Sequence, residues 1–291
     1  MRVALLHNAS AGSEDHGERE LRKLLSQAGH EVAHVVTGVA DLTAALHESP
    51  CDLVVVAGGD GTVGRTACEL SGWQVPLSVV PLGTANNTAL SLKLPTDGKR
   101  LASRLEVAER VPFDLGMVSD GSVRRRFAEA VGWGVFPSAA AEAKRIKQAS
   151  RKGSVERTLK RDRKLFRAVA QSAPVRPYRI EVDGRDLSGD YVLVEIMNVP
   201  LLGPRLLLSG QSDPGDGRFE LVMAGEAERS LLDELATTGV MSQSLKTERG
   251  TQFRIEASEG VYHRDGRVVR HALGPRSFEI EVEPQPISYL R

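Results

Sequence analysis

The sequence has little of what marks secreted, membrane-spanning or nucleic-acid-binding proteins. Its 291 residues include only two cysteines, which form no CxxC pair, so we expect a reducing compartment. Lysine plus arginine and aspartate plus glutamate number 38 each, so no net charge attracts the chain to nucleic acid. No stretch approaches the roughly 20 apolar residues of a transmembrane helix, and the first residues are too briefly apolar for a signal peptide. We therefore expect a cytoplasmic protein.

A glycine motif follows an apolar strand candidate. The motif is Gly58-Gly59-Asp60-Gly61-Thr62. It comes directly after Leu53–Ala57 and directly before Val63–Leu70, which we expect to be a strand and a helix. A strand that enters a glycine turn and then a helix presents backbone N–H groups and the positive end of the helix dipole at one point. Because glycine leaves no side chain between backbone and ligand, the motif predicts a phosphate-binding turn.

Asp60 is the acidic residue of this motif. Its carboxylate would lie beside the phosphates, where it could hold Mg²⁺ or take the proton of a hydroxyl group. The alternative is a glycine turn with only a structural role.

The first third of the chain alternates strand and helix patterns. Strands are expected at Val3–Leu6, Glu31–Val36, Leu53–Ala57 and Leu77–Val80, with helical spacing of leucines between them. This alternation predicts a doubly wound parallel sheet with helices on both faces. Ligands of such sheets bind beyond the carboxyl ends of the strands. The loops 8–13, 58–62 and 81–87 follow three of these ends and are the expected walls of one pocket.

After about Val111 the pattern changes to closely spaced strands. Asp120-Gly121 and Asp183-Gly184 are hairpin turn signals between strand-like residues. Most of the later strands have no helix between them, which favours antiparallel pairing. Two helical patches interrupt them, at Pro137–Ala170 and Ala227–Leu245. We expect an antiparallel, β-sandwich-like domain with helical insertions over residues 113–283, following an α/β domain over residues 1–112.

Three segments together resemble the catalytic domain of the diacylglycerol kinase and sphingosine kinase family, within the NAD-kinase-like superfamily. They are the loop at Asn8, the glycine motif, and Pro81-Leu82-Gly83-Thr84-Ala85-Asn86. Asp216-Gly217 and Asp265-Gly266 resemble two later Asp-Gly turns of the family. The resemblance implies bacterial soluble lipid kinases of this size, with ATP as donor, Mg²⁺, and a diacylglycerol-like lipid hydroxyl as acceptor. It also implies that a C-terminal strand, residues 284–291, returns to the first domain, and that a homodimer forms.

The resemblance also implies roles for individual residues. The ATP phosphates would contact Asn8, Ser10, Gly12, Gly58, Gly59, Gly61 and Gly83, with the hydroxyls of Thr62 and Thr84. Asn86 would stabilise its loop or contact the nucleoside, and Asp60 would orient Mg²⁺ or the nucleophile. Asp216 would hold a structural metal ion or brace the site.

Two positions depart from the family pattern. Asn87 and Arg267 stand where relatives commonly carry carboxylates. Loss of a general base typically costs about 10²–10⁴ in rate, so a slow enzyme is expected. Arg267 would either stabilise the transferring phosphoryl group or be a solvent-facing hairpin residue. The alternatives are a nucleotide-binding pseudo-kinase with a regulatory role, and an NAD or polyol kinase.

The span Lys144–Arg167 is rich in lysine and arginine and poor in acids. A basic helical pair would suit an anionic membrane surface, contacted peripherally by the protein as it acts on a lipid. The alternative is a solvated helix face.

Overall fold

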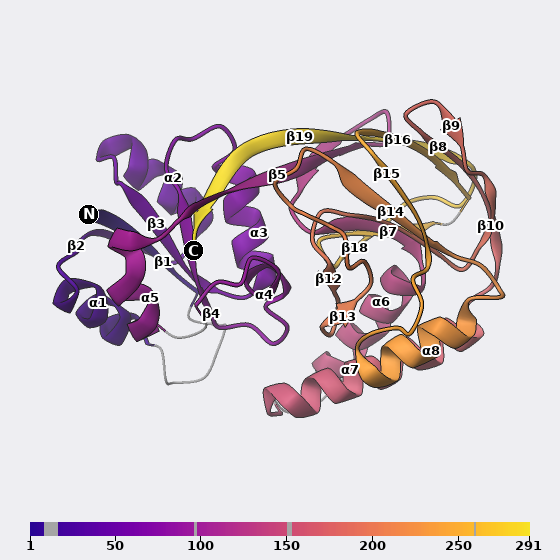
Figure 1. Ribbon diagram of the computed structural model, residues 1–291, viewed down its shortest axis with the longest axis horizontal. Helices are drawn as coiled ribbons and strands as arrows, with labels where there is room; N and C mark the ends of the chain where they lie inside the picture. The colour runs from indigo at the N-terminus through magenta and orange to yellow at the C-terminus, as the bar shows by residue number, and fades with distance from the viewer. Residues whose placement is uncertain (9–16, 96–97, 150–152, 259) are drawn as a thin grey trace. The chain divides into compact units, whose positions relative to one another are not determined.

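The computed structural model shows two compact units (Figure 1). One unit comprises Met1–Phe113 together with Gln285–Arg291, and the other comprises Asp114–Pro284. Strands β5 (Arg110–Ser119) and β19 (Arg276–Leu290) each begin in one unit and end in the other. The structure describes the whole chain except residues 9–16, 96–97, 150–152 and 259.

The first unit is built on a parallel sheet. Its strands lie in the order β2-β1-β3-β4-β19, and Tyr289 of β19 pairs in parallel with Leu77 of β4. The strands are β1 (Arg2–His7), β2 (Glu31–Val36), β3 (Leu53–Gly58) and β4 (Leu77–Pro81). The helices are α1 (Glu18–Gln27), α2 (Val39–Glu48), α3 (Asp60–Glu69), α4 (Asn87–Ser91), α5 (Gly98–Arg104) and the 3₁₀ helix η2 (Leu105–Val107).

Helices cover both faces of this sheet, as the alternation of patterns predicted. Val3, Leu5 and Val55 face α1 and α5 in one buried cluster, which includes Leu25 and Leu101. Helices α2 and α3 pack against β1, β2, β3 and β4. Strand β3 lies between β1 and β4 in the middle of the sheet, so every one of its residues is buried. Its carboxyl end lies between the segments that follow the neighbouring strands.

The second unit consists of two antiparallel sheets and a layer of helices. One sheet has the order β10-β8-β16-β19, with β5 paired to β19 and β6, and β9 paired to β8; the other has the order β15-β14-β11-β7-β17-β18. The first sheet's strands, besides β5 and β19, are β6 (Arg124–Phe127), β8 (Arg176–Val182), β9 (Arg185–Asp186), β10 (Gly189–Tyr191) and β16 (Gln252–Ala257). The second sheet's are β7 (Ala130–Gly134), β11 (Leu193–Met197), β14 (Phe219–Ala224), β15 (Lys246–Gly250), β17 (Val261–Arg264) and β18 (Arg267–Arg270).

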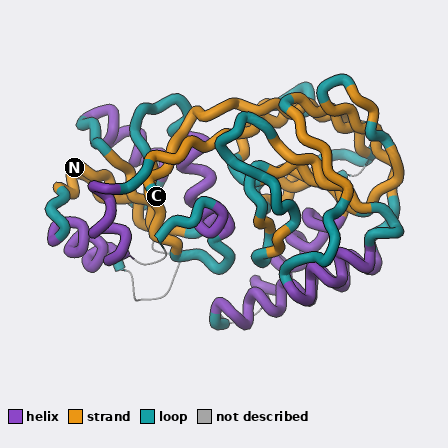
Figure 2. The backbone as a smooth tube through the Cα atoms, viewed as in Figure 1, coloured by secondary structure: helices purple, strands orange, loops and turns teal. Residues whose placement is uncertain are grey.

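Two cores hold these layers together. The inner faces of both sheets meet around Trp133, Phe253 and Phe278, as in a β-sandwich. The other face of the second sheet packs on the helices through Phe136, Phe166 and similar residues. The helices are α6 (Val135–Ala149), α7 (Val155–Ser172) and α8 (Arg229–Thr238), gathered on one side of the strands (Figure 2). A small hairpin joins β12 (Leu201–Leu202) to β13 (Leu206–Leu207). The predicted fold class is therefore confirmed.

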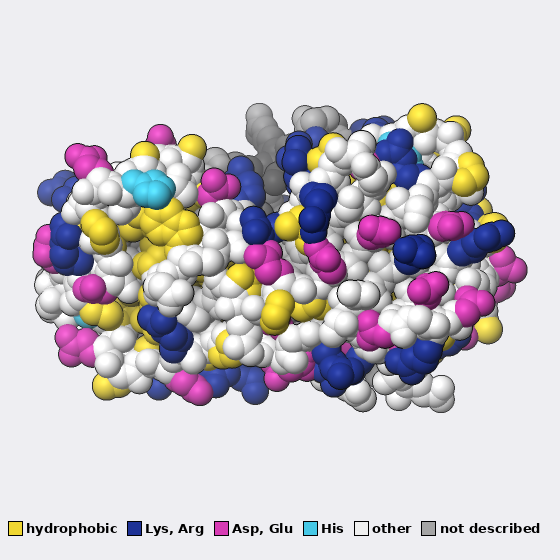
Figure 3. Space-filling view, turned by 90° about the horizontal axis from the view of Figure 1, so that it is seen from above, with side chains coloured by type: hydrophobic (Ala, Val, Ile, Leu, Met, Phe, Trp, Pro, Cys, Tyr) yellow, Lys and Arg dark blue, Asp and Glu magenta, His cyan; other side chains and the backbone are white. Residues whose placement is uncertain are grey.

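Charges of both signs mix on the surface of the second unit (Figure 3). Arg126 of β6 pairs with Glu283 of β19, and Arg254 of β16 pairs with Glu279 of β19. Among the residues that the structure describes, no helix is long and apolar enough to cross a membrane.

The predicted hairpin turn at Asp120 is present between β5 and β6. Burial of the Asp120 carboxylate raises its pKa, but hydrogen bonds from Ser122 and Val123 and the ion pair with Arg276 outweigh this and lower the pKa to about 2. Because the folded pKa is lowered, the stabilisation is present above the ordinary pKa near 4 and is lost as the pH falls towards 2. After allowance for solvent screening, we expect Asp120→Asn to cost about 1 kcal/mol at pH 7. Urea unfolding of both proteins should show this gap closing below pH 4; a gap that persists at pH 2 would contradict it.

Candidate functional site

The glycine motif joins β3 to α3 without an intervening loop. Strand β3 ends at Gly58, Gly59 precedes the helix, and α3 begins at Asp60. The helix therefore starts inside the motif, earlier than the predicted Val63. The N–H groups of Thr62 and Val63 donate to the carbonyl of Gly59 and close the first turn. The N–H groups at the start of α3 thus stand at the positive end of its dipole.

Two loops approach each other closely at glycine residues. A Cβ atom on Gly59 would stand 2.9 Å from the Cα atom of Gly83, and one on Gly83 would stand 2.6 Å from the Cα atom of Gly59. The N–H group of Leu82 also donates to the carbonyl of Gly58. Backbone therefore packs on backbone here, which only glycine allows.

Asn86 braces the second of these loops. Its backbone is left-handed, with φ 55°. Its Oδ1 atom accepts from the N–H group of Gly83 at 2.8 Å, and its Nδ2 atom donates to the carbonyls of Gly83 and Pro81. The amide thus holds the loop closed on itself, one of the two roles expected of it.

Hydrogen bonds join the segments that follow β1, β3 and β4. The Nδ2 atom of Asn8 donates to the Oγ1 atom of Thr62 at 2.8 Å, and Thr62 is buried. The N–H group of Thr88 donates to the Oδ1 atom of Asp60 at 3.2 Å. Thr84 is exposed on the loop after β4. The structure thus brings Asn8, Asp60 and Thr62 together, whereas Ser10 and Gly12 lie outside the described residues.

Gly61 is the open position of the motif. It is exposed, and among the described residues, apart from its own helix and chain neighbours, no atom lies within 4 Å of a Cβ atom placed on it. Within the described part of the chain, the space beside Gly61 is therefore open next to a carboxylate. Mg²⁺ usually takes one or two carboxylates together with phosphate oxygens and water, so Asp60 alone fits such an ion. The described residues contain no group of three acidic, histidine or cysteine side chains that would hold a metal by themselves.

Arg267 lies in the second unit as the first residue of β18, and it is exposed. It follows the turn Asp265-Gly266, in which both residues have positive φ, 48° and 67°. The Asp265 carboxylate accepts hydrogen bonds from the N–H groups of residues 128–130. Burial raises the pKa of Asp265. The turn before Arg267 is thus tied to the start of β7.

Asp216 also lies in the second unit, and both of its oxygen atoms have partners. Oδ1 accepts from the N–H group of Arg218 at 3.0 Å, and Oδ2 forms an ion pair with Arg249. The following N–H group, that of Gly217, donates to Asp114 at 2.7 Å. A metal ion at Asp216 would have to displace the arginine.

A buried pair in the second unit, Glu195 with His263, was not predicted from the sequence. The sign that was present is an acidic residue inside an otherwise apolar strand, Leu193–Met197. Its partner lies far along the chain, so no spacing rule connects the two.

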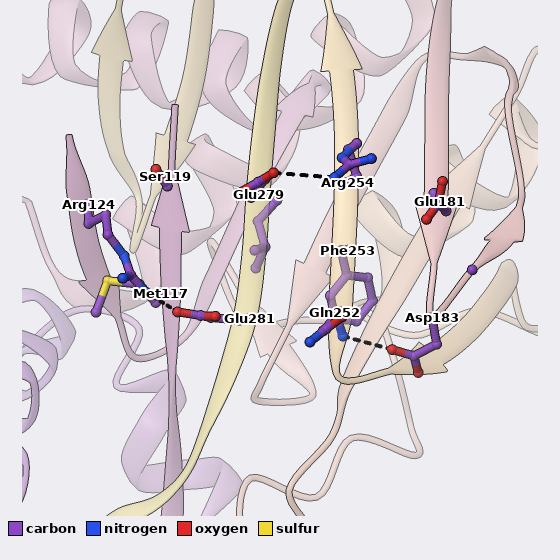
Figure 4. A pocket seen from close by; sticks show the side chains of 12 residues that line it. Met117, Ser119, Arg124, Glu181, Asp183, Gln252, Phe253, Arg254, Glu279 and Glu281 are labelled. Carbon is purple, nitrogen blue, oxygen red and sulfur yellow. Dashed lines mark hydrogen bonds and ion pairs between the residues drawn. The ribbon is translucent and has the colours of Figure 1, made fainter. Parts of the chain in front are cut away.

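A hollow of about 380 Å³ lies on the outer face of the sheet that contains β8, β16 and β19 (Figure 4). Three of its acids have partners of their own: Glu281 pairs with Arg124, Glu279 pairs with Arg254, and Asp183 accepts from Thr251 and Gln252. The hollow contains none of the predicted site residues.

Known proteins resemble this chain in sequence and in fold. Residues 2–118 match the family model of the diacylglycerol kinase catalytic domain, which contains the glycine motif and the Gly83 loop. These residues are thus similar to the diacylglycerol kinase catalytic domain. A diacylglycerol kinase of Mycobacterium tuberculosis is 26% identical over 281 residues, covering 92% of this chain and 87% of the relative. A diacylglycerol kinase of Bacillus subtilis is 26% identical over 275 residues, covering 89% and 86%.

Solved structures extend the likeness of fold to the whole chain. A diacylglycerol kinase of Bacillus anthracis superposes with a TM-score of 0.71 at 17% identity, covering 99% of this chain and 96% of that one. A yeast NADH kinase complexed with NADH gives 0.57 at 12% identity, covering 100% and 82%. The diacylglycerol kinase family and the NADH kinase thus share this fold, as the resemblance implied.

Proposed function

We propose that the chain is a lipid kinase that transfers the γ-phosphoryl group of ATP to the hydroxyl of a diacylglycerol-like lipid. The observation that supports this most is the open backbone at Gly61 beside the Asp60 carboxylate, at the start of α3. Phosphoryl transfer needs chiefly positioning and neutralisation of charge, and this turn offers backbone donors and one metal-binding carboxylate. The family of the first domain supports the same reaction.

Each residue of the turn has a part in the proposal. Backbone N–H groups of Gly59, Asp60 and Gly61 bind phosphate oxygens, and the close contact of Gly59 with Gly83 fixes the shape of the turn. Mg²⁺, when bound with ATP, neutralises phosphate charge, and Asp60 is the residue that would hold it. Asp60 alternatively takes the acceptor's hydroxyl proton. Because Arg249 occupies Asp216, we propose no metal there.

Arg267 and Asn87 bear on the rate. Arg267 is an exposed cation, which suits stabilisation of a phosphoryl group and not proton abstraction. Asn87, the first residue of α4, is buried and neutral. We infer a slow enzyme, and Arg267→Glu, which restores the family's carboxylate, is the direct probe.

The proposal is tested by transfer of labelled phosphate from Mg-ATP to acceptors in mixed micelles. Diacylglycerol, sphingoid bases and phosphatidylglycerol are compared with soluble polyols and NAD. A labelled diacylglycerol product supports the proposal. Labelled NAD or polyol instead would establish a different kinase, and Mg-ATP binding without any product would establish the non-catalytic alternative.

We further propose that the protein contacts the membrane's inner face peripherally through α7. Arg157, Lys160 and Lys164 are exposed and follow one another at helical spacing, so they share a face of the helix. Val155, near its start, is 47% exposed. Each basic residue near an anionic surface contributes roughly 1 kcal/mol.

Reversal of two of these charges, Lys160→Glu with Lys164→Glu, should therefore weaken binding to phosphatidylglycerol vesicles by about tenfold or more. Vesicle sedimentation measures this. The control is Arg179→Glu with Lys246→Glu, two exposed cations on strands that change the net charge equally. Equal weakening in both double variants would show that only net charge matters and would contradict a docking face on α7.

A further inference from the structure

A buried pair of titratable side chains lies in the second unit, away from the glycine motif in sequence. Glu195 is on β11 and His263 is on β17, and their side chains are 0% and 2% exposed. The Nε2 atom of His263 lies 2.7 Å from the Oε2 atom of Glu195. Burial of ionisable side chains costs folding free energy unless they pair with each other, so the presence of this pair calls for an explanation.

A glycine makes the pair possible. Strand β7 runs between β11 and β17, and its Gly132 is the residue opposite both Glu195 and His263. A Cβ atom on Gly132 would stand 2.1 Å from the carboxyl carbon of Glu195. The two side chains therefore meet over the strand that separates them, and any side chain at this position would part them.

The other side of the imidazole contacts a turn. The N–H group of Gly266 donates to the Nδ1 atom of His263 at 3.3 Å. Because Nδ1 accepts, the neutral ring carries its proton on Nε2 and donates it to Glu195. The hydrogen bonds thus run from Gly266 through His263 to Glu195.

The same turn is held from its other end by Asp265, through the N–H groups of residues 128–130. The N–H group of Asp265 in turn donates to the carbonyl of Ala130. Arg267 is the next residue after the turn. Its backbone position is therefore set by two side chains, those of the half-buried Asp265 and the buried His263.

We propose that His263 and Glu195 are positioning residues, which hold the Asp265–Arg267 turn in place and release it when the imidazole takes a second proton. The effect on catalysis rests on the proposed kinase function through Arg267. The effect on the turn does not depend on the proposed kinase function.

Release follows from hydrogen-bond chemistry. A second proton would sit on Nδ1 and face the N–H group of Gly266, so two donors would oppose each other and that bond would be lost. Burial raises the pKa of Glu195.

The other charged groups near the imidazole belong to three elements. Helix α6 packs against β17 and β18, and its Phe136 ring lies 6.1 Å from the imidazole. Among the residues whose side chains the structure describes, the charged residues of these elements and of the turn are Arg264 of β17, Asp265 of the turn, Arg267 and Arg270 of β18, and Glu142, Lys144 and Arg145 of α6. Glu142 and Arg145 pair with each other.

Amide hydrogen exchange in the intact, ¹⁵N-labelled chain tests the effect on the turn. After correction for intrinsic exchange, protection of the Gly266 amide should fall about tenfold on acidification, the loss of one hydrogen bond. Protection of the Leu187 amide, which donates to the carbonyl of Ile180 on β8, should not change with pH in this way. In His263→Gln, whose side chain does not titrate, the pH dependence should vanish.

Gly132→Ala should lower Gly266 protection at neutral pH, whereas Gly210→Ala, at a glycine with open space around it, should not. A Gly266 amide whose protection ignores pH, or the same pH dependence in His263→Gln, would overturn the proposal.

Activity separates the two levels of the proposal. With diacylglycerol as acceptor, kcat of the wild type should decrease on acidification over the same pH range in which Gly266 loses protection. In His263→Gln this decrease in kcat should be absent. If no acceptor is phosphorylated at any pH, the kinase function fails while the exchange result still decides the role of the pair. If kcat shows no such decrease although the turn loosens, the link to catalysis is wrong.

Discussion

Asp60→Asn should lower kcat for phosphoryl transfer by about 10²–10⁴-fold. The carboxylate is the charged group at the open start of α3, and the proposal gives it either the metal ion or the hydroxyl proton. The substitution is closely matched, because asparagine keeps an oxygen that accepts from the N–H group of Thr88. Stability should therefore stay within about 0.5 kcal/mol of the wild type.

Three measurements on this variant separate its possible effects. Urea unfolding checks the fold, calorimetric titration with Mg-ATP checks nucleotide binding, and the micelle assay gives kcat. Full activity in a folded variant would remove Asp60 from the mechanism. Lost activity together with lost stability would show that the carboxylate acts on the loop through Thr88 and not on the reaction.

Two glycine substitutions should separate shape from ligand contact. Gly61→Ala adds a methyl group that meets none of the described residues beyond its own helix, in a helix position where alanine is favoured by about 1 kcal/mol, so the fold should not weaken. If phosphate lies over this backbone, the methyl group meets it instead, and the Kd for Mg-ATP should rise by about tenfold or more.

Gly83→Ala should behave differently. The new methyl group would press on the Cα atom of Gly59 at 2.6 Å and on the Oδ1 atom of Asn86 at 2.7 Å. Overpacking of this kind costs about 1–3 kcal/mol, so stability and binding should fall together. Calorimetry and urea unfolding of the two variants decide the matter. Unchanged Mg-ATP affinity in Gly61→Ala would place the phosphates elsewhere.

The strands of the first sheet could be predicted from the sequence because the hydrophobic patterns that mark them are local. Buried strands such as Leu53–Gly58 are continuous apolar runs. The start of α3 was placed too late, since Gly59 and Gly61 have poor helix propensity and hide a helix that begins between them. Tertiary context overrides that propensity here.

The contacts that shape the sites were beyond local patterns. Gly59 and Gly83 follow two different strands, and the local sequence around either glycine does not predict that the two come into contact. The pair of Glu195 and His263 depends on the register of three strands and on a glycine in the middle one. Register between distant strands is set by the whole core, so a single sequence gives the residue types but not their meeting.

The last strand of the chain has a consequence for synthesis. The first unit takes its edge strand from residues 285–291, after the whole second unit has been made. During synthesis the sheet of the first unit therefore has an open edge next to β4 until residues 285–291 emerge from the ribosome. Until then, the edge that β19 will occupy offers unpaired backbone groups to any other strand. The domain that begins first is finished last, so its assembly waits on the folding of the domain inserted within it.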